Sequence, residues 1–164
     1  MPYVNSKVKA NFKSLYSLHT RLKQLENFST RAGFWKEVYH PNGKLNSAEL
    51  ATILEFGANT EGEAGYIPPR PFIKDGAEDS LIELRSMFLS RFYNFLGGAG
   101  RKTSPRDTLH PMGKVMAKWI GQRILFNSYT RNAPLTIEIK GFDRPLYETG
   151  WLADHVQVKT RKKV

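Results

Sequence analysis

Three prolines within four residues constrain the fold more than any other feature of this 164-residue sequence. Pro68, Pro69 and Pro71 lie in the stretch GYIPPRPFIKDG, residues 65–76. Each proline fixes its own φ and lacks a backbone donor, and the residue before it is held in an extended conformation. The stretch therefore cannot be a helix or a central strand. We expect a rigid strut that delivers Phe72 to the start of the next element.

Helical patterns flank this strut on both sides. Before it, Asn46 followed by Glu49 predicts a capping box, and Gly57 predicts the end of a short, mostly buried helix. After it, apolar residues recur every three or four positions from Asp75 to about Leu96. That spacing predicts a long helix with one apolar face.

The remaining chain predicts further helices and two strands, from the different periods of helical and extended segments. The expected elements are a helix over Val4–Phe28, a strand within residues 29–43, a basic loop over 97–108, a helix over Pro111–Asn127, a short extended piece over Leu135–Lys140, a capped turn over Thr149–Asp154 and a strand over His155–Lys159. We expect the last strand to pair near Gly33. The prediction is one α+β domain over 1–164, with three to four helices on a small, mainly antiparallel sheet.

The first of these helices is amphipathic. Its leucines, at Leu15, Leu18, Leu22 and Leu25, follow one another at steps of three and four and form one stripe. The stripe could cover a sheet or lie against a neighbouring subunit. We treat residues 1–28 as this helix and the rest of the chain as a core with a basic tail.

Composition narrows the class of protein. The sequence has no cysteine, which excludes disulfides and thiolate metal sites. No secretory signal pattern and no membrane-length apolar run is present, and 40% of the residues are hydrophobic. We expect a soluble, folded protein that is made in a reducing cytoplasm.

The positive charge is concentrated in the second half of the chain. Residues 1–82 carry 10 basic and 9 acidic side chains, whereas residues 83–164 carry 15 and 6. A basic half can face nucleic acid, an acidic protein partner or only solvent. The residues that we expect to face a partner or DNA are Arg101, Lys102, Arg106, Lys159, Arg161, Lys162 and Lys163.

Catalytic and cofactor patterns are not evident in the sequence. His19, His40, His110 and His155 occur in turn, cap or surface contexts, without the spacing of metal ligands. The GGAG segment lacks the Lys-Ser/Thr ending of a phosphate-binding loop, and no serine lies in a nucleophile elbow. We therefore expect no enzymatic activity, no cofactor and no metal. A small hydrolase is a remote alternative.

Two charged residues beside apolar neighbours suggest an interface. Glu55 lies between Leu54 and Phe56 at a helix end, where it is either simply exposed or placed to contact another residue. We expect the prolines to hold the Arg70 guanidinium outward, where it would meet a carboxylate such as Glu55 at a subunit contact.

The stretch RPLYETGWL, residues 144–152, allows two interpretations. Thr149 can cap a turn that returns Trp151 and Leu152 to the core. Alternatively, the stretch is a hinge that docks the C-terminal strand beside the one near Gly33 and sets a sheet edge for a neighbouring subunit.

Taken together, the segments AELATILEFG, IPPRPFI and APLTIEIKGFDRPLYETGWL resemble the tail-completion or virion-morphogenesis proteins of tailed bacteriophages, the group that includes the Mu-type G protein. The resemblance covers about residues 30–160. The residues that carry it are Glu55, Phe56, Gly57, Pro68, Arg70, Pro71, Phe72, Pro134, Leu135, Thr136, Lys140, Pro145, Leu146, Thr149, Gly150 and Leu152.

The resemblance implies a structural protein of the neck or upper tail that completes the tail or joins head to tail. It implies a ring of identical subunits, often six, and contacts with the connector, tail terminator or tail tube. We expect this protein in the virion, assembled in the host cytoplasm, with a basic nucleic-acid-binding protein as the alternative.

Two sets of residues follow as candidates. The subunit-interface candidates are Glu55, Phe56, Pro68, Pro69, Arg70, Pro71, Phe72, Pro145, Leu146, Thr149, Gly150 and Trp151. We expect the loop over residues 97–108 and the tail from Lys159 to be mobile in the free subunit, because glycines and like charges oppose ordering.

Overall fold

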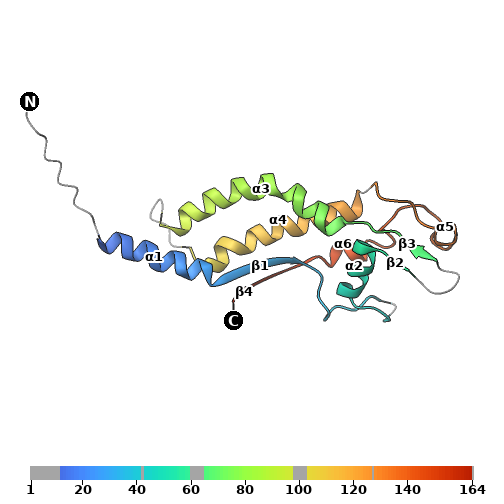
Figure 1. Ribbon diagram of the computed structural model, residues 1–164, viewed down its shortest axis with the longest axis horizontal. Coiled ribbons are helices and arrows are strands. Elements are labelled where there is room, and N and C mark those ends of the chain that lie inside the picture. The colour runs from blue at the N-terminus through green and yellow to red at the C-terminus, as the bar shows by residue number, and fades with distance from the viewer. Residues whose placement is uncertain (1–11, 42, 60–64, 98–102, 127, 164) are drawn as a thin grey trace, which may run out of the picture.

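The computed structural model describes residues 12–41, 43–59, 65–97, 103–126 and 128–163. Its elements are α1 (Phe12–Glu26), β1 (Phe28–Gly33), α2 (Ser47–Phe56), β2 (Ala58–Asn59), β3 (Tyr66–Ile67), α3 (Phe72–Phe95), α4 (Pro105–Leu125), α5 (Pro134–Lys140), α6 (Trp151–Asp154) and β4 (Gln157–Lys162). The fold is α+β, as predicted, with more helices among the described residues than the three or four expected (Figure 1).

The long helices α3 and α4 lie side by side and form the centre of the molecule (Figure 1). Gly76 makes their close approach possible, because a Cβ built there would lie 2.7 Å from the Cα of Ile120. Farther along, Arg123 forms an ion pair with Asp79. The indole of Trp119 donates to Glu83 at 2.9 Å. Close packing at Gly76 fixes one part of the contact between α3 and α4. The polar contacts of Arg123 and Trp119 fix the part farther along.

Strands β1 and β4 pair in an antiparallel sheet that lies against α4. Gly33 faces Gln157 in the register, which confirms the predicted pairing of the C-terminal strand with the segment near Gly33. The hydroxyls of Thr30 and Thr160 are 2.8 Å apart across the pair. At Gly113 a Cβ would lie 2.5 Å from Val158, so this glycine lets α4 approach the sheet.

The strand predicted within residues 29–43 is shifted toward the N-terminus. It ends at Gly33, because Phe34 turns into the core. The Val38 amide then donates to the Trp35 carbonyl at 3.3 Å in a turn. Tyr39 makes only an isolated bridge to Asn46. The aromatic residues that suggested a strand therefore belong to a connecting segment.

Helix α4 begins six residues earlier than predicted and contains Pro111 in its interior. The Ser104 hydroxyl caps it by accepting from the Asp107 amide at 3.0 Å. Pro111 cannot donate to the Asp107 carbonyl, but Arg91 of α3 donates to that oxygen at 3.0 Å. The prediction of a helix start at Pro111 is wrong, because this tertiary donor is not visible in the sequence. Residues 105–108 are thus helical, and residues 98–102 of the predicted loop lie outside the described ranges.

The extended piece expected at Leu135–Lys140 is wrong, because these residues form helix α5. Pro134 occupies its first turn, and Gly141, with φ of 76°, ends it by donating to the Ile137 carbonyl at 2.8 Å. So short an alternation of apolar and polar residues fits a helix as well as a strand, so the flanking Pro134 and Gly141 decide that the segment is helical.

The tail prediction also requires correction. Residues 159–162 belong to β4 and pair with Phe28–Arg31, so they are ordered within the subunit itself. Cross-strand hydrogen bonds outweigh the repulsion among the like charges in this segment.

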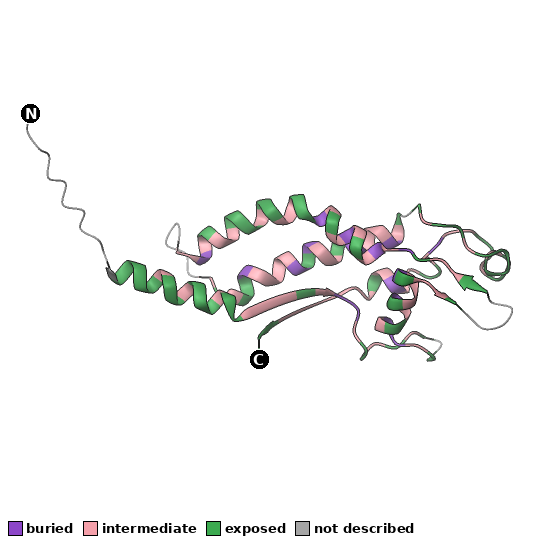
Figure 2. Cartoon of the chain, viewed as in Figure 1, coloured by how far each residue is buried: buried purple, intermediate pink, exposed green. Residues whose placement is uncertain are grey.

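The core lies at one end of the molecule, where α2, α6, the start of α3 and the end of α4 meet (Figure 2). Its buried members are Phe34, Ala51, Phe72, Ile120, Ile124 and Leu152. At the other end α1 extends beyond the α3–α4 pair and is largely exposed (Figures 1 and 2). Arg21 connects it to the body by donating to the Phe95 carbonyl. No helix in the described ranges could span a membrane.

Candidate functional site

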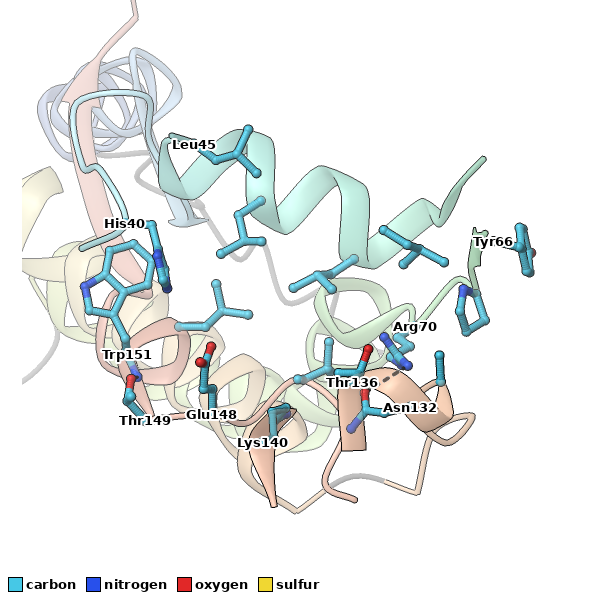
Figure 3. A pocket seen from close by; sticks show the side chains of 17 residues that line it. His40, Leu45, Tyr66, Arg70, Asn132, Thr136, Lys140, Glu148, Thr149 and Trp151 are labelled. Atoms are coloured by element: carbon cyan, nitrogen blue, oxygen red, sulfur yellow. Dashed lines mark hydrogen bonds between the residues drawn. The ribbon is translucent and has the colours of Figure 1, made fainter. Parts of the chain in front are cut away.

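The main cavity of the described structure, about 340 Å³, opens beside the Pro-rich strut (Figure 3). It lies between α2, the strut, α5 and the segment that leads into α6. Its lining residues are His40, Leu45, Leu50, Leu54, Tyr66, Ile67, Pro68, Arg70, Asn132, Ala133, Thr136, Lys140, Leu146, Glu148, Thr149, Trp151 and Leu152. We call this cavity the strut pocket.

The strut is fixed against α2 by backbone contacts. The Arg70 amide donates to the Leu54 carbonyl at 2.9 Å. The Phe72 amide then donates to the Arg70 carbonyl at 2.7 Å, which closes an inverse γ-turn around Pro71 (φ −77°, ψ 54°). Gly57 allows this approach, because a Cβ there would lie 2.6 Å from the Ile67 carbonyl oxygen.

The strut delivers Phe72 to the core, as predicted. Its ring is fully buried and meets the ring of Phe34 edge-on, with the centroids 5.9 Å apart. The long helix starts at this residue, three positions before the predicted start. The stiffness of the proline segment thus aims one large side chain into the core and holds one wall of the pocket.

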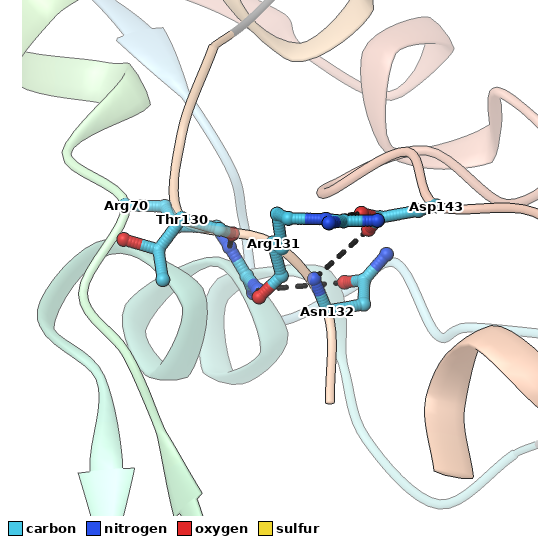
Figure 4. Close-up of polar contacts among 5 residues, drawn as sticks. All are labelled: Arg70, Thr130, Arg131, Asn132 and Asp143. Carbon is cyan, nitrogen blue, oxygen red and sulfur yellow. Dashed lines mark hydrogen bonds and ion pairs between the residues drawn. The ribbon is translucent and has the colours of Figure 1, made fainter. Parts of the chain in front are cut away.

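Arg70 points inward, and the expectation of an outward guanidinium is wrong. Only 5% of the residue is exposed. Its Nε donates to the Thr130 carbonyl at 3.2 Å, and its Nη2 donates to the Arg131 carbonyl and the Asn132 Oδ1, each at 3.4 Å (Figure 4). Burial lowers the pKa of the Arg70 guanidinium, and the charge of nearby Asp143 opposes that effect. Among the described residues no ion pair includes Arg70.

Glu55 is buried, and no hydrogen bond or ion pair joins it to Arg70 among the described residues. Its carboxylate accepts from the amides of Ile73, at 2.8 Å, and Lys74, at 3.1 Å. These amides belong to the first turn of α3, whose N-cap residue, Pro71, offers no side-chain cap. A buried carboxylate from α2 therefore caps α3, where free amides and the helix dipole favour negative charge.

The loop before α5 closes the polar side of the pocket. Asp143 accepts from the Asn132 amide at 3.0 Å and forms an ion pair with Arg131 (Figure 4). The hydrogen bond from Arg131, followed by that from Asn132, lowers the pKa of the Asp143 carboxyl. Although the side-chain oxygen of Asn132 accepts from Arg70, its Nδ2 is buried and has no hydrogen-bond partner among the described residues.

The RPLYETGWL segment forms the opposite wall. Thr149 Oγ1 accepts from the Trp151 amide at 3.3 Å, and Leu152 is buried in the core, as the capped-turn interpretation predicts, although the N-cap residue of α6 itself is Gly150, which has no side chain to cap it. Trp151 lies between two histidine rings, His40 with its centroid at 4.9 Å and His155 at 4.2 Å. Leu146 lines the pocket in the left-handed region at φ 61°, where non-glycine residues are uncommon.

Lys140 joins this wall to α5. Its ammonium donates to the carbonyl of Arg144 at 3.0 Å and to that of Tyr147. Burial lowers the pKa of Lys140, whereas the nearby Glu148 carboxylate raises it. Two partly desolvated cations, Lys140 and Arg70, therefore line the same cavity.

The structure brings together only part of the predicted interface set. The members that line the strut pocket are Pro68, Arg70, Leu146, Thr149 and Trp151. The members that do not line it are Glu55, Phe56, Pro69, Pro71, Phe72, Pro145 and Gly150. Phe56 is 75% exposed, whereas Glu55, Phe72 and Pro145 are buried. Sequence reasoning missed Asn132, because no motif marks a residue that acts through the distant Arg70.

The basic candidates lie away from this pocket. Arg106 is exposed in the first turn of α4, Arg161 and Lys162 are exposed at the end of β4, and Lys163 is exposed directly after it. Lys159 donates to Glu37 at 3.2 Å and lies 4.4 Å from the centroid of the Trp35 ring. Arg101 and Lys102 lie outside the described residues.

No group of three metal-ligating side chains occurs in the described part of the chain. Comparisons with protein-family models, curated proteins and solved structures gave no match.

Proposed function

We propose that this chain is a structural protein of a tailed-phage virion, which acts in the neck or upper tail to complete the tail or join it to the head. It works as an assembly component, in contact with copies of itself and with other neck or tail proteins. The strut pocket is the contact site for such a neighbour.

The convergence of the three family-like segments on one cavity carries this proposal. AELATILEFG contributes Leu50 and Leu54, IPPRPFI contributes Pro68 and Arg70, and the C-terminal segment contributes the wall from Ala133 to Leu152. These segments are up to about one hundred positions apart in the sequence. Motif residues that only stabilised the core would not need to share an open cavity.

Exposed apolar side chains on the long helices support contacts with further copies. On α3 they are Leu81, Ile82, Phe88, Leu89 and Tyr93, and on α1 they are Leu15, Tyr16 and Leu22. Ile82, Leu89 and Tyr93 follow one another at steps of seven and four and so share one face of α3, and exposed apolar faces are typical of protein contacts. In the stripe on α1, Leu15 and Leu22 are 56% and 40% exposed, so a neighbouring subunit is the predicted partner for these side chains.

Mass photometry and negative-stain imaging of the purified chain test the proposal. We expect closed rings of one size, and six subunits is the number that the resemblance implies. A protein that stays monomeric at every concentration and whose DNA affinity falls steeply with salt would instead support the nucleic-acid-binding alternative. That alternative draws on the exposed basic residues at the end of β4 and the start of α4.

A further inference from the structure

The polar side of the strut pocket has more hydrogen-bond donors than acceptors. Arg70, Asn132, Thr136 and Lys140 lie along this side (Figure 3). The donors of Arg70 and Lys140 described above meet only carbonyl or amide oxygens, which are neutral. Asp143 and Glu148 lie near these cations, but neither cation forms an ion pair among the described residues, so both can favour an incoming anion.

Asn132 shows where such an anion would bind. Its Nδ2 is buried and has no acceptor in the described structure. Buried side-chain donors are almost always paired, and an unpaired one costs free energy. The amide cannot turn its oxygen to this position without giving up the contact with Arg70. The site therefore lacks an oxygen acceptor beside Asn132.

The rest of the cavity is apolar and limits what can carry that oxygen. The side chains of Leu45, Leu50, Leu54, Leu146 and Leu152 line it. A cavity of about 340 Å³ holds a few side chains but not a folded element. A simple inorganic anion would leave this wall uncovered, and a nucleic-acid backbone would bring sugars and phosphates against leucines.

We propose that the strut pocket binds a short segment of a partner protein in which a carboxylate side chain adjoins large apolar side chains. The carboxylate accepts from Asn132 Nδ2 and faces the charges of Arg70 and Lys140. The apolar side chains pack between the leucines of α2 and Leu146. The chemistry follows from the pocket, and its source in a virion partner depends on the function proposed above.

Glu148 makes this inference sharply testable. It is the one carboxylate that lines the pocket among the described residues, and its side chain is exposed. It would repel the carboxylate of the ligand. Glu148→Gln should therefore strengthen binding, a gain that general damage to the fold cannot produce.

The probe is the capped tripeptide acetyl-Leu-Glu-Leu-amide, with acetyl-Leu-Gln-Leu-amide as its uncharged match. Each is titrated into the ¹⁵N-labelled full chain, and NMR follows the Asn132 side-chain amide and the Trp151 indole. We expect saturable shifts with the Glu peptide and affinity about tenfold weaker for the Gln peptide, as one charge-assisted hydrogen bond is lost. Glu148→Gln should increase the affinity for the Glu peptide and leave the affinity for the Gln peptide unchanged. Glu138→Gln, on α5 but outside the pocket lining, should change neither.

Asn132→Asp is the loss-of-binding variant. It keeps an oxygen for Arg70 but replaces the free donor with a carboxylate, so the protein should stay folded and lose the Glu peptide. No saturable shift with either peptide would overturn the inference, and so would equal affinity for the two. Equal shifts from inorganic phosphate would show an anion site without peptide selectivity, which also overturns it.

Ring formation is recorded on the same samples. Rings without peptide binding would remove this inference and leave the proposed function in place. Peptide binding by a chain that never forms rings would support this inference and contradict the proposed function.

Discussion

The two ends of this molecule differ in how they use polar and apolar side chains. At the pocket end charged groups are buried and have assigned partners, as with Glu55 at the start of α3 and Arg70 at the loop before α5. Toward the other end no such buried charge is described, and large apolar groups such as Ile82 and Leu89 are exposed along α3, as Phe56 and Ile139 are singly at the pocket end. The buried charged groups of the pocket end thus find their partners within the subunit. We infer that the exposed apolar side chains of α3 serve contacts with other copies, in line with the proposed function.

The largest effect on stability should come from the core at the pocket end. Phe72→Ala removes a fully buried ring and should lower the free energy of unfolding by about 3–5 kcal/mol. Phe56→Ala is the matched control, because that ring is 75% exposed and its loss should cost less than about 0.5 kcal/mol. Urea denaturation measures both. Similar costs for the two variants would show that the strut does not aim Phe72 into the core.

Arg70→Ala tests the buried polar network of the same end. The loss of hydrogen bonds to three oxygens should lower the free energy of unfolding by about 2 kcal/mol. Arg106→Ala, at an exposed position, should be close to neutral. If Arg70→Ala were as stable as the parent chain, the guanidinium would not tether the loop before α5.

The local part of this fold could be predicted from the sequence. Asn46 and Glu49 form the expected capping box, with side-chain contacts of 2.9 and 3.1 Å. Gly57 ends the helix as predicted, and the prolines keep the strut extended. The signals at these positions lie within a few residues of their effects, so no tertiary information is needed.

The features of the fold and of the pocket that could not be predicted depend on contacts between positions far apart in the sequence. Pro111 is tolerated inside α4 because Arg91, twenty residues earlier, donates to the freed carbonyl. Arg70 turns inward because its acceptors lie about sixty residues later, at Thr130 to Asn132. The pocket was only partly predictable for the same reason: its motifs were recognised, but Asn132 carries no local signal.

The response to acid should involve the contact between the long helices. Hydrogen bonding from Arg123 lowers the pKa of Asp79, and hydrogen bonding from Trp119 is the main cause of the lowered pKa of Glu83. A carboxyl group whose pKa is lower in the folded state stabilises the fold above its ordinary pKa and loses that contribution as pH falls through the folded-state value. Stability should therefore decline below about pH 4–5.

Asp79→Asn, measured by thermal unfolding across pH, should make that decline shallower. Asp154→Asn, at an exposed position outside the described ion pairs, should leave it unchanged. Parallel pH profiles for the parent chain and Asp79→Asn would exclude the helix contact as a source of the acid response.

The smallest effect on the free subunit, and the sharpest contrast between the ends, should come from exposed isoleucines. Ile82 on α3 is 87% exposed and Ile139 on α5 is 77% exposed, so Ile→Ser at either site should change the free energy of unfolding by less than about 0.5 kcal/mol. The two variants should separate in self-association, measured by sedimentation velocity. Ile82→Ser removes apolar area from the surface shared with Leu89 and should weaken assembly, whereas Ile139→Ser should not. If both variants assembled like the parent chain, the apolar face of α3 would not be a contact between copies.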